Sequence, residues 1–193
     1  LGGTGRDAMI SVAFILTASI MTSTEQVSFI GQNGWEFQAK IHIPEELEGH
    51  AVLMIGGGIG NSLNWTTPET LLLGNVETQI TISGKSHDDA SIISDALVSK
   101  GCITMHYSTV SLDDPKCDLY PYELGLTDPQ SVMEIARAAY KTFKQHPAVQ
   151  ECSHVVLGFS IGAQRAVQLA KENSEITCLV LLSGAQMTAT SKA

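Results

Sequence analysis

Residues 155–162, which read VVLGFSIG, decide how this chain can fold. Three apolar residues that suit a buried strand run directly into a G-x-S-x-G sequence, and this order has the form of a nucleophile elbow between a strand and a helix. The serine of such an elbow occupies a sharp, strained turn from which its hydroxyl projects. Gly158 and Gly162 flank Ser160 at the two positions that must be small if the strand and the helix are to pack closely.

The residues after the elbow favour a helix. Ala163, Ala166, Val167 and Ala170 recur at helical spacing, which predicts an amphipathic helix that begins at the elbow. The amino end of that helix would stabilise negative charge that develops beside Ser160. A chance match in a surface loop is the alternative, but the strand and helix patterns on either side favour a functional elbow.

The end of the sequence lacks the partners that such a serine needs. A Ser-His-Asp system on this kind of elbow takes its acid and its histidine from later in the chain, in that order. The residues after Gly162 contain no histidine and no aspartate, and Glu172 and Glu175 fall at the far end of the predicted helix. We therefore expect a fragment that ends before its last strands, which agrees with a start at Leu1.

Composition favours one folded domain. The chain has 193 residues, of which 44% are hydrophobic and 16% charged, so one α/β domain over residues 25–193 is expected. Its 11 basic and 20 acidic residues give a net charge of −9, which argues against nucleic acid or an anionic membrane as a partner. The composition does not indicate an oligomeric state.

The cysteines and acidic residues do not form a metal-binding pattern. Cys102, Cys117, Cys152 and Cys178 are far apart and include no C-x-x-C pair, so neither a zinc site nor a redox motif is expected. Cys102 and Cys178 lie in apolar runs and are expected to be buried, whereas Cys117 lies in a polar loop. A disulfide stays an open alternative. The acidic loop 112–115 is expected to be a solvated turn and not a metal site.

Residues 8–21, AMISVAFILTASIM, form an uncharged apolar stretch that has two interpretations. The stretch suits the core of a signal peptide and is too short to span a bilayer, so residues 1–24 would be removed and the protein exported. Alternatively, Met21 is the initiator, the residues before it are upstream translation, and the protein is cytoplasmic. We favour export.

From residue 27 onward, strand patterns alternate with helix patterns. Such alternation predicts a mostly parallel sheet with helices on both faces, a three-layer α/β architecture whose last strands are missing. The helix over residues 88–100 is expected to bury Ile92, Ile93, Ala96 and Leu97 on one face. The other helices begin at residue 129 and at the elbow, and the strands besides that of the elbow cover 27–30, 35–43, 51–55, 102–107 and 176–182.

The glycine run at residues 56–60, GGGIG, follows the strand at 51–55 and does not match a nucleotide-binding loop. A dinucleotide fingerprint needs G-x-G-x-x-G at the start of a helix, and a triphosphate loop needs G-K-[ST]. In an acyl-transfer enzyme, such a loop brings a backbone N–H close to the substrate carbonyl. The amides of Gly58, less surely Ile59, and of Ile161 are the expected donors, and a plain tight turn is the alternative.

Over residues 25–185, the order of these segments resembles the α/β-hydrolase fold, specifically its bacterial esterase or peptidase-like members. The resemblance rests on AVLMIGGGIGN, on CITMHYST and above all on HVVLGFSIGAQRA. It implies that Ser160 is the nucleophile, that the Ile161 amide is one oxyanion donor and that residues 56–58 supply the other. Family members often carry histidine where this chain has Gly56, and their acid and catalytic histidine would lie beyond residue 193.

His106 is the histidine with the strongest claim to a functional position. The predicted strand 102–107 nearly ends at His106, so the side chain would lie near the sheet edge where active-site loops gather. A structural histidine with satisfied hydrogen bonds is the favoured interpretation, and a contact with substrate is the alternative. The other five histidines are expected to be surface or capping residues.

The sequence therefore predicts a serine hydrolase that acts on an ester, thioester or amide carbonyl of a small-molecule acyl substrate through an acyl-enzyme, without a cofactor or a metal. The nucleophile is Ser160, and the fragment alone is expected to be inactive because it lacks the histidine that would accept the serine's proton. Two alternatives stay open. One is a non-catalytic binding domain that keeps the elbow as architecture, and the other is a serine acyltransferase.

Overall fold

The computed structural model describes residues 22–31, 34–57, 70–72, 79–81, 89–111 and 129–182. Strands and helices alternate through most of this part of the chain. In chain order the elements are β1 (Thr22–Ile30), β2 (Glu36–Pro44), β3 (His50–Ile55), β4 (Thr70–Leu72), β5 (Gln79–Thr81), α1 (Asp89–Val98), β6 (Ile103–Ser111), α2 (Pro129–Gln145), β7 (Ser153–Phe159), α3 (Gly162–Glu172) and β8 (Ile176–Leu182).

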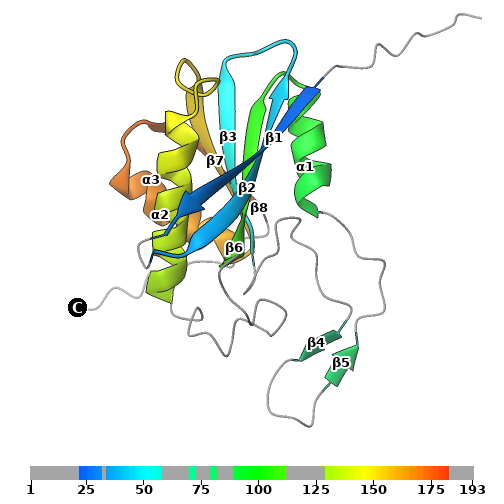
Figure 1. Ribbon diagram of the computed structural model, residues 1–193, viewed down its shortest axis with the longest axis vertical. Helices are drawn as coiled ribbons and strands as arrows, with labels where there is room; N and C mark the ends of the chain where they lie inside the picture. Colours follow the sequence, from blue (N-terminus) through cyan, green and yellow to red (C-terminus); the bar gives the residue numbers. More distant parts are fainter. Residues whose placement is uncertain are drawn as a thin grey trace, which may run out of the picture.

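Six of the strands form one sheet in the order β1-β2-β6-β3-β7-β8, and β4 pairs with β5 in a separate two-stranded sheet. Strands β6, β3, β7 and β8 are parallel, whereas β2 is antiparallel to both β1 and β6. Helices α2 and α3 cover one face of the large sheet and α1 covers the other (Figure 1). The expected mostly parallel sheet with helices on both faces is therefore confirmed.

The larger core lies between the sheet and the helices α2 and α3. The side chains of strand β6 alternate between the two faces of the sheet, and Ile103, Met105 and Tyr107 are the ones buried on this face. Phe143 of α2 and Leu169 of α3 are fully buried against them. Each such side chain contributes about 1.5–3 kcal/mol of hydrophobic free energy relative to an exposed one. The apolar residues Ile135, Ala136, Ala139 and Phe143, which recur at helical spacing, therefore form the face of α2 that packs.

The smaller core, on the α1 face, differs from the expectation. Ile92 has 60% of its surface exposed, and Ala96 is exposed too, while Ser94 is fully buried. The helix turns Ser94 toward the sheet, where the hydroxyls of Ser94 and Thr104 lie 2.5 Å apart and satisfy each other. Ile93 and Leu97 do pack against this core. The predicted face of α1 was therefore wrong at two of its four positions.

Several segments are longer or more structured than the sequence patterns indicated. Strand β1 begins at Thr22, inside the range 1–24 that was expected to be a leader or upstream translation. Strand β6 continues to Ser111, which pairs with Phe37 of β2 beyond a register shift between Phe37 and Ala39. The polar segment after the glycine run contains the short strands β4 and β5.

Within the described residues, β8 is an edge strand that pairs only with β7. Val180, Leu181 and Leu182 are all at least one third exposed. Cys178 on the same strand is exposed as well, so its expected burial was wrong, and Cys102 is only half-buried. Cys102, Cys152 and Cys178 are free thiols, and Cys117 lies outside the described residues.

Candidate active site

The order in which the chain adds strands to the sheet reverses between the neighbouring strands β3 and β7. After β3 it passes through α1, on one face, to β6; after β7 it passes through α3, on the other face, to β8 (Figure 1). In open α/β sheets, such a switch point leaves a crevice at the carboxyl ends of the two strands, where ligands bind. The register pairs Ile55 with Gly158 there, so Gly56 and Ser160 follow the ends of neighbouring strands.

Ser160 lies at this switch point in a conformation that serine rarely adopts. Its φ is +56°, and no other non-glycine residue of the described part has a positive φ. The left-handed region costs an L-residue roughly 1–2 kcal/mol, so the surrounding structure must hold the turn. One contact that stabilises the turn is a hydrogen bond of 2.9 Å, in which the Ser160 N–H donates to the carbonyl oxygen of Leu182 at the end of β8.

Three glycines surround Ser160, and none has room for a side chain. A Cβ at Gly57 would lie 2.5 Å from the Ser160 Cβ and 3.2 Å from its Oγ. A Cβ at Gly158 would lie 2.6 Å from the Cα of Ala163, and one at Gly162 would lie 2.2 Å from the carbonyl oxygen of Ile55. The end of β3, the end of β7 and the start of α3 therefore meet backbone to backbone around the serine.

The amino end of α3 begins directly after Ser160. The first hydrogen bonds of the helix run from the Ala163 N–H to Ser160 O, 3.0 Å, and from the Gln164 N–H to Ile161 O, 3.1 Å. Ile161 is already helical, with φ −58° and ψ −28°, and no side chain caps this end of the helix. The amides of Ile161 and Gly162 precede these bonds, as the first N–H groups of a helix do.

The two expected oxyanion donors are described to different extents. Ile161 lies beside Ser160 at the amino end of α3, with its side chain exposed. Gly58 lies outside the described residues, so the structure says nothing of its position. Gly57, the residue before it, is the glycine seen against Ser160, and the sequence pattern did not single it out.

Sequence reasoning also missed Arg165, which connects α3 to the end of β3. Its Nη1 donates to the carbonyl oxygen of Gly56 over 3.3 Å. Burial lowers the pKa of this guanidinium, and the nearby Tyr107 acts in the opposite direction. Burial disfavours the charged form of Tyr107 as well, and for this phenol the result is a raised pKa, since its hydroxyl lies in the core. No motif marks Arg165, because its role depends on a contact with a residue 109 positions away.

The histidines of the described residues lie outside the turn that carries Ser160. Because β6 extends to Ser111, His106 is in the middle of its strand, fully buried, with its ring centroid 5.3 Å from that of His42. The expected place of His106 near the end of its strand was therefore wrong, and its substrate contact stays a prediction. His50 and His154 lie at the starts of β3 and β7, at the opposite edge of the sheet from Ser160.

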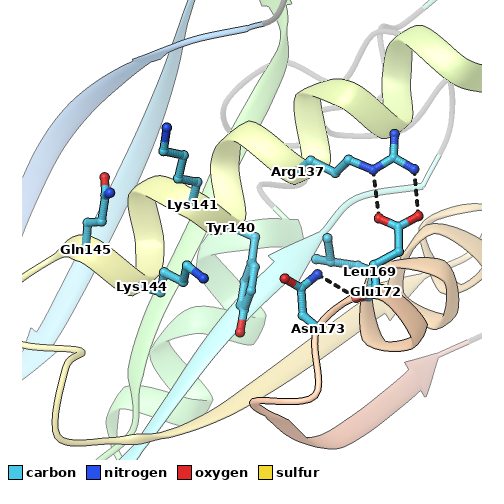
Figure 2. A pocket seen from close by; sticks show the side chains of 8 residues that line it. All are labelled: Arg137, Tyr140, Lys141, Lys144, Gln145, Leu169, Glu172 and Asn173. Carbon is cyan, nitrogen blue, oxygen red and sulfur yellow. Dashed lines mark hydrogen bonds and ion pairs between the residues drawn. The ribbon is translucent and has the colours of Figure 1, made fainter.

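A cavity of about 370 Å³ lies between α2 and α3, but it is at the far end of α3 from Ser160. Figure 2 shows Arg137 of α2 reaching Glu172 of α3 across it, and Asn173 donating back to the carbonyl of Leu169. Lys144 of α2 forms an ion pair with Glu175 nearby. Neither Ser160 nor any of the three glycines around it lines this cavity.

Two further observations concern the part of the chain that the structure describes. No three His, Cys, Asp or Glu side chains in it are grouped closely enough to hold a metal ion. None of its helices has both the length and the apolar character needed to cross a lipid bilayer.

No protein-family model matches this sequence, and neither does any curated protein. Solved structures do match. The dienelactone hydrolase of Anabaena variabilis is 16% identical and has a TM-score of 0.60 over 84% of this chain and 64% of its own. A thermostable carboxyl esterase of Bacillus coagulans is 15% identical, with a TM-score of 0.54 over 82% of this chain and 44% of its own.

A third similar structure is a dienelactone hydrolase-like phosphotriesterase from metagenomic libraries. It is 15% identical, with a TM-score of 0.57 over 84% of this chain and 59% of its own. In all three cases this chain spans less than two thirds of the length of the protein it matches. Together with the order of the strands and the turn at Ser160, these likenesses show that the chain has the α/β-hydrolase fold.

Proposed function

We propose that Ser160 is the nucleophile of a serine hydrolase that cleaves an ester, thioester or amide carbonyl through an acyl-enzyme. The observation that carries this proposal is the left-handed turn of Ser160 at the switch point of the sheet, with Gly57 packed against its side chain. A strained turn persists only where the surrounding structure enforces it, and such turns are concentrated at functional sites.

The surroundings of Ser160 suit the chemistry of acyl transfer. Attack of the serine oxygen on a carbonyl carbon produces a tetrahedral oxyanion, which needs hydrogen-bond donors in place before the reaction. The Ile161 amide, at the amino end of α3, is one proposed donor, and the helix dipole there favours negative charge. The loop that begins at Gly57 supplies the other donor in this proposal, at Gly58.

The serine also needs a general base to accept its proton and an acid to orient that base. We propose that both lie beyond residue 193, and the proposed activity is accordingly that of the full-length protein. The similar structures include a dienelactone hydrolase and a carboxyl esterase, which is consistent with the proposal at the level of the fold. A small-molecule acyl substrate is proposed, and no cofactor is required.

The test is covalent labelling of the full-length protein with a fluorophosphonate, which reacts with an activated serine to form a stable phosphonyl ester. Ser160→Ala should abolish labelling. Ser153→Ala is the matched control, since Ser153 lies exposed at the opposite end of β7, and it should label like the wild type. Labelling that survives in Ser160→Ala would contradict the nucleophile assignment, and a wild-type protein that never labels would favour a non-catalytic binding domain.

A serine acyltransferase would label in the same way, because it uses the same acyl-enzyme. Incubation with an activated ester and an added alcohol or amine separates the two outcomes. Release of free acid with no dependence on the acceptor is expected for the hydrolase. Transfer of most acyl groups to the acceptor would instead support the acyltransferase.

A further inference from the structure

Arg165 is a half-buried cation in an unusual place. It lies in the first turn of α3, where the helix dipole is positive and a cation is disfavoured. Its side chain is withdrawn from water enough to lower its pKa, yet a guanidinium stays protonated. The ion pairs that Arg137, Lys144 and His146 form within the described residues do not include Arg165.

Packing alone does not explain a charge at this position. Burying a charged group costs free energy unless hydrogen bonds and an opposite charge compensate. The buried residues near it on α3, Ala163, Ala166 and Leu169, are apolar, so their side chains offer the guanidinium no hydrogen-bond partner. Places where a sequence departs from such local rules are often functional.

The contact that Arg165 makes is with the peptide next to the serine. Its Nη1 donates to the Gly56 carbonyl, and the same peptide unit carries the N–H of Gly57. Gly57 is the residue whose Cα faces the Ser160 side chain closely enough to exclude a Cβ. Since the peptide bond is planar, holding the carbonyl of Gly56 also fixes the direction of the Gly57 N–H and the start of the loop that follows. A charged donor at the carbonyl further polarises the N–H of that peptide.

We propose that Arg165 is a positioning residue of the Ser160 site, which holds the peptide between Gly56 and Gly57 so that Gly57 stays aligned with the serine side chain. This proposal rests on the proposed serine chemistry. It goes beyond that chemistry because it assigns the alignment of this peptide to a side chain of α3 that does not itself touch the reacting atoms.

The first test measures the rate of the reaction in the full-length protein. Arg165→Met removes the donor and keeps the aliphatic stem, Arg165→Lys keeps a charge and a donor, and Gln164→Met is the control at an exposed neighbour. The rate constant of fluorophosphonate labelling should fall roughly 10- to 100-fold in Arg165→Met, the size typical of groups that orient a reactive residue, and recover in part in Arg165→Lys. With an activated ester as substrate, the loss should be in kcat and not in KM.

The second test does not depend on activity. In the Ser160→Ala background, hydrogen exchange of the Gly57 amide should become at least roughly threefold faster when Arg165→Met is added, because local opening is no longer opposed by this hydrogen bond. A folded Arg165→Met protein with unchanged exchange and wild-type labelling would overturn the proposal, as would a loss confined to KM. If the wild type does not label but exchange responds as expected, the serine chemistry fails and the positioning contact stands. If Arg165→Met does not fold, the same criteria apply to Arg165→Lys.

Discussion

The two ends of α3 are built by different means. At the amino end, Gly57, Gly158 and Gly162 let backbone segments meet around a strained Ser160, and none of the three glycines has space for a Cβ. At the carboxyl end, long charged side chains span the gap to α2. The Arg137 Nε and Nη2 donate to the two carboxylate oxygens of Glu172 over 2.7 and 2.6 Å (Figure 2).

This difference indicates where the fold can tolerate change. Contacts between backbones cannot relax, so the position of the serine is fixed by steric exclusion. The ion pair between Arg137 and Glu172 has about a third of each side chain exposed, and water can replace most of what it contributes. The amino end should therefore respond sharply to small substitutions and the carboxyl end only weakly.

The largest effect is expected for Gly162→Ala. The added methyl group would meet the backbone oxygen of Ile55 at 2.2 Å, and neither strand β3 nor helix α3 can move away without disturbing the elbow. We expect the free energy of unfolding to fall by at least about 3 kcal/mol, measured by urea denaturation.

Two control variants isolate the cause of that loss. Gly34→Ala places the same methyl group in open space at a positive φ of 80°, so only backbone strain of about 1 kcal/mol is expected. Lys171→Ala, at the exposed carboxyl end of α3, should change stability by less than about 0.5 kcal/mol. A Gly162→Ala protein as stable as Gly34→Ala would show that the amino end is looser than the backbone contacts indicate.

A smaller effect, of the opposite sign, is expected at Ser160. Glycine adopts a positive φ without strain, whereas alanine keeps the strain of the serine. Allowing for the greater freedom of glycine in the unfolded chain, Ser160→Gly should be more stable than Ser160→Ala by about 0.5–1 kcal/mol. Thermal or urea unfolding of the two variants compares them directly, and both should lose fluorophosphonate labelling. If Ser160→Gly is the less stable variant, the turn is not strained.

The sequence predicted the parts of this fold that follow from local patterns. The range of β8, the start of α2 at Pro129 and the start of α3 after the elbow were all read from apolar periodicity, proline and glycine, and the structure confirms them. These signals are contained in a few neighbouring residues, so a single sequence is enough to find them.

What the sequence could not predict depends on residues far apart in the chain. Ser94 can be buried because its hydroxyl forms a hydrogen bond with the hydroxyl of Thr104 on β6. With Ser94 facing the sheet, Ile92 is exposed. Arg165 of α3 donates a hydrogen bond to Gly56 at the end of β3, and only the folded chain brings these two residues together. The roles assigned to Ser160 and Ile161 stay predictions, because they concern chemistry that geometry alone does not test.

The smallest effect concerns the ion pair at the carboxyl end of α3. Hydrogen bonds from Arg137 and Gln168 lower the pKa of Glu172 to about 2, from 4.5 for the ordinary group. An unfolded chain therefore binds a proton at Glu172 below about pH 4.5, while the folded chain stays ionised until about pH 2. The stability that Glu172 contributes is thus complete above pH 4.5 and is lost as the pH falls from 4.5 to 2.

Glu172→Gln should accordingly lower the free energy of unfolding at pH 6 by less than about 1 kcal/mol, because the pair is partly exposed, and by still less at pH 2.5. Adding 1 M NaCl should weaken the effect at pH 6 as well. Glu175→Gln is the matched control, since its ion pair with Lys144 is more exposed. Hydrogen bonds from Lys144 and Tyr140 lower the pKa of Glu175 as well, so a change of the same kind but smaller is expected. A Glu172→Gln effect that exceeds that of Gly162→Ala, or that stays the same at both pH values, would mean that the carboxyl end of α3 is held as rigidly as the end that carries the serine.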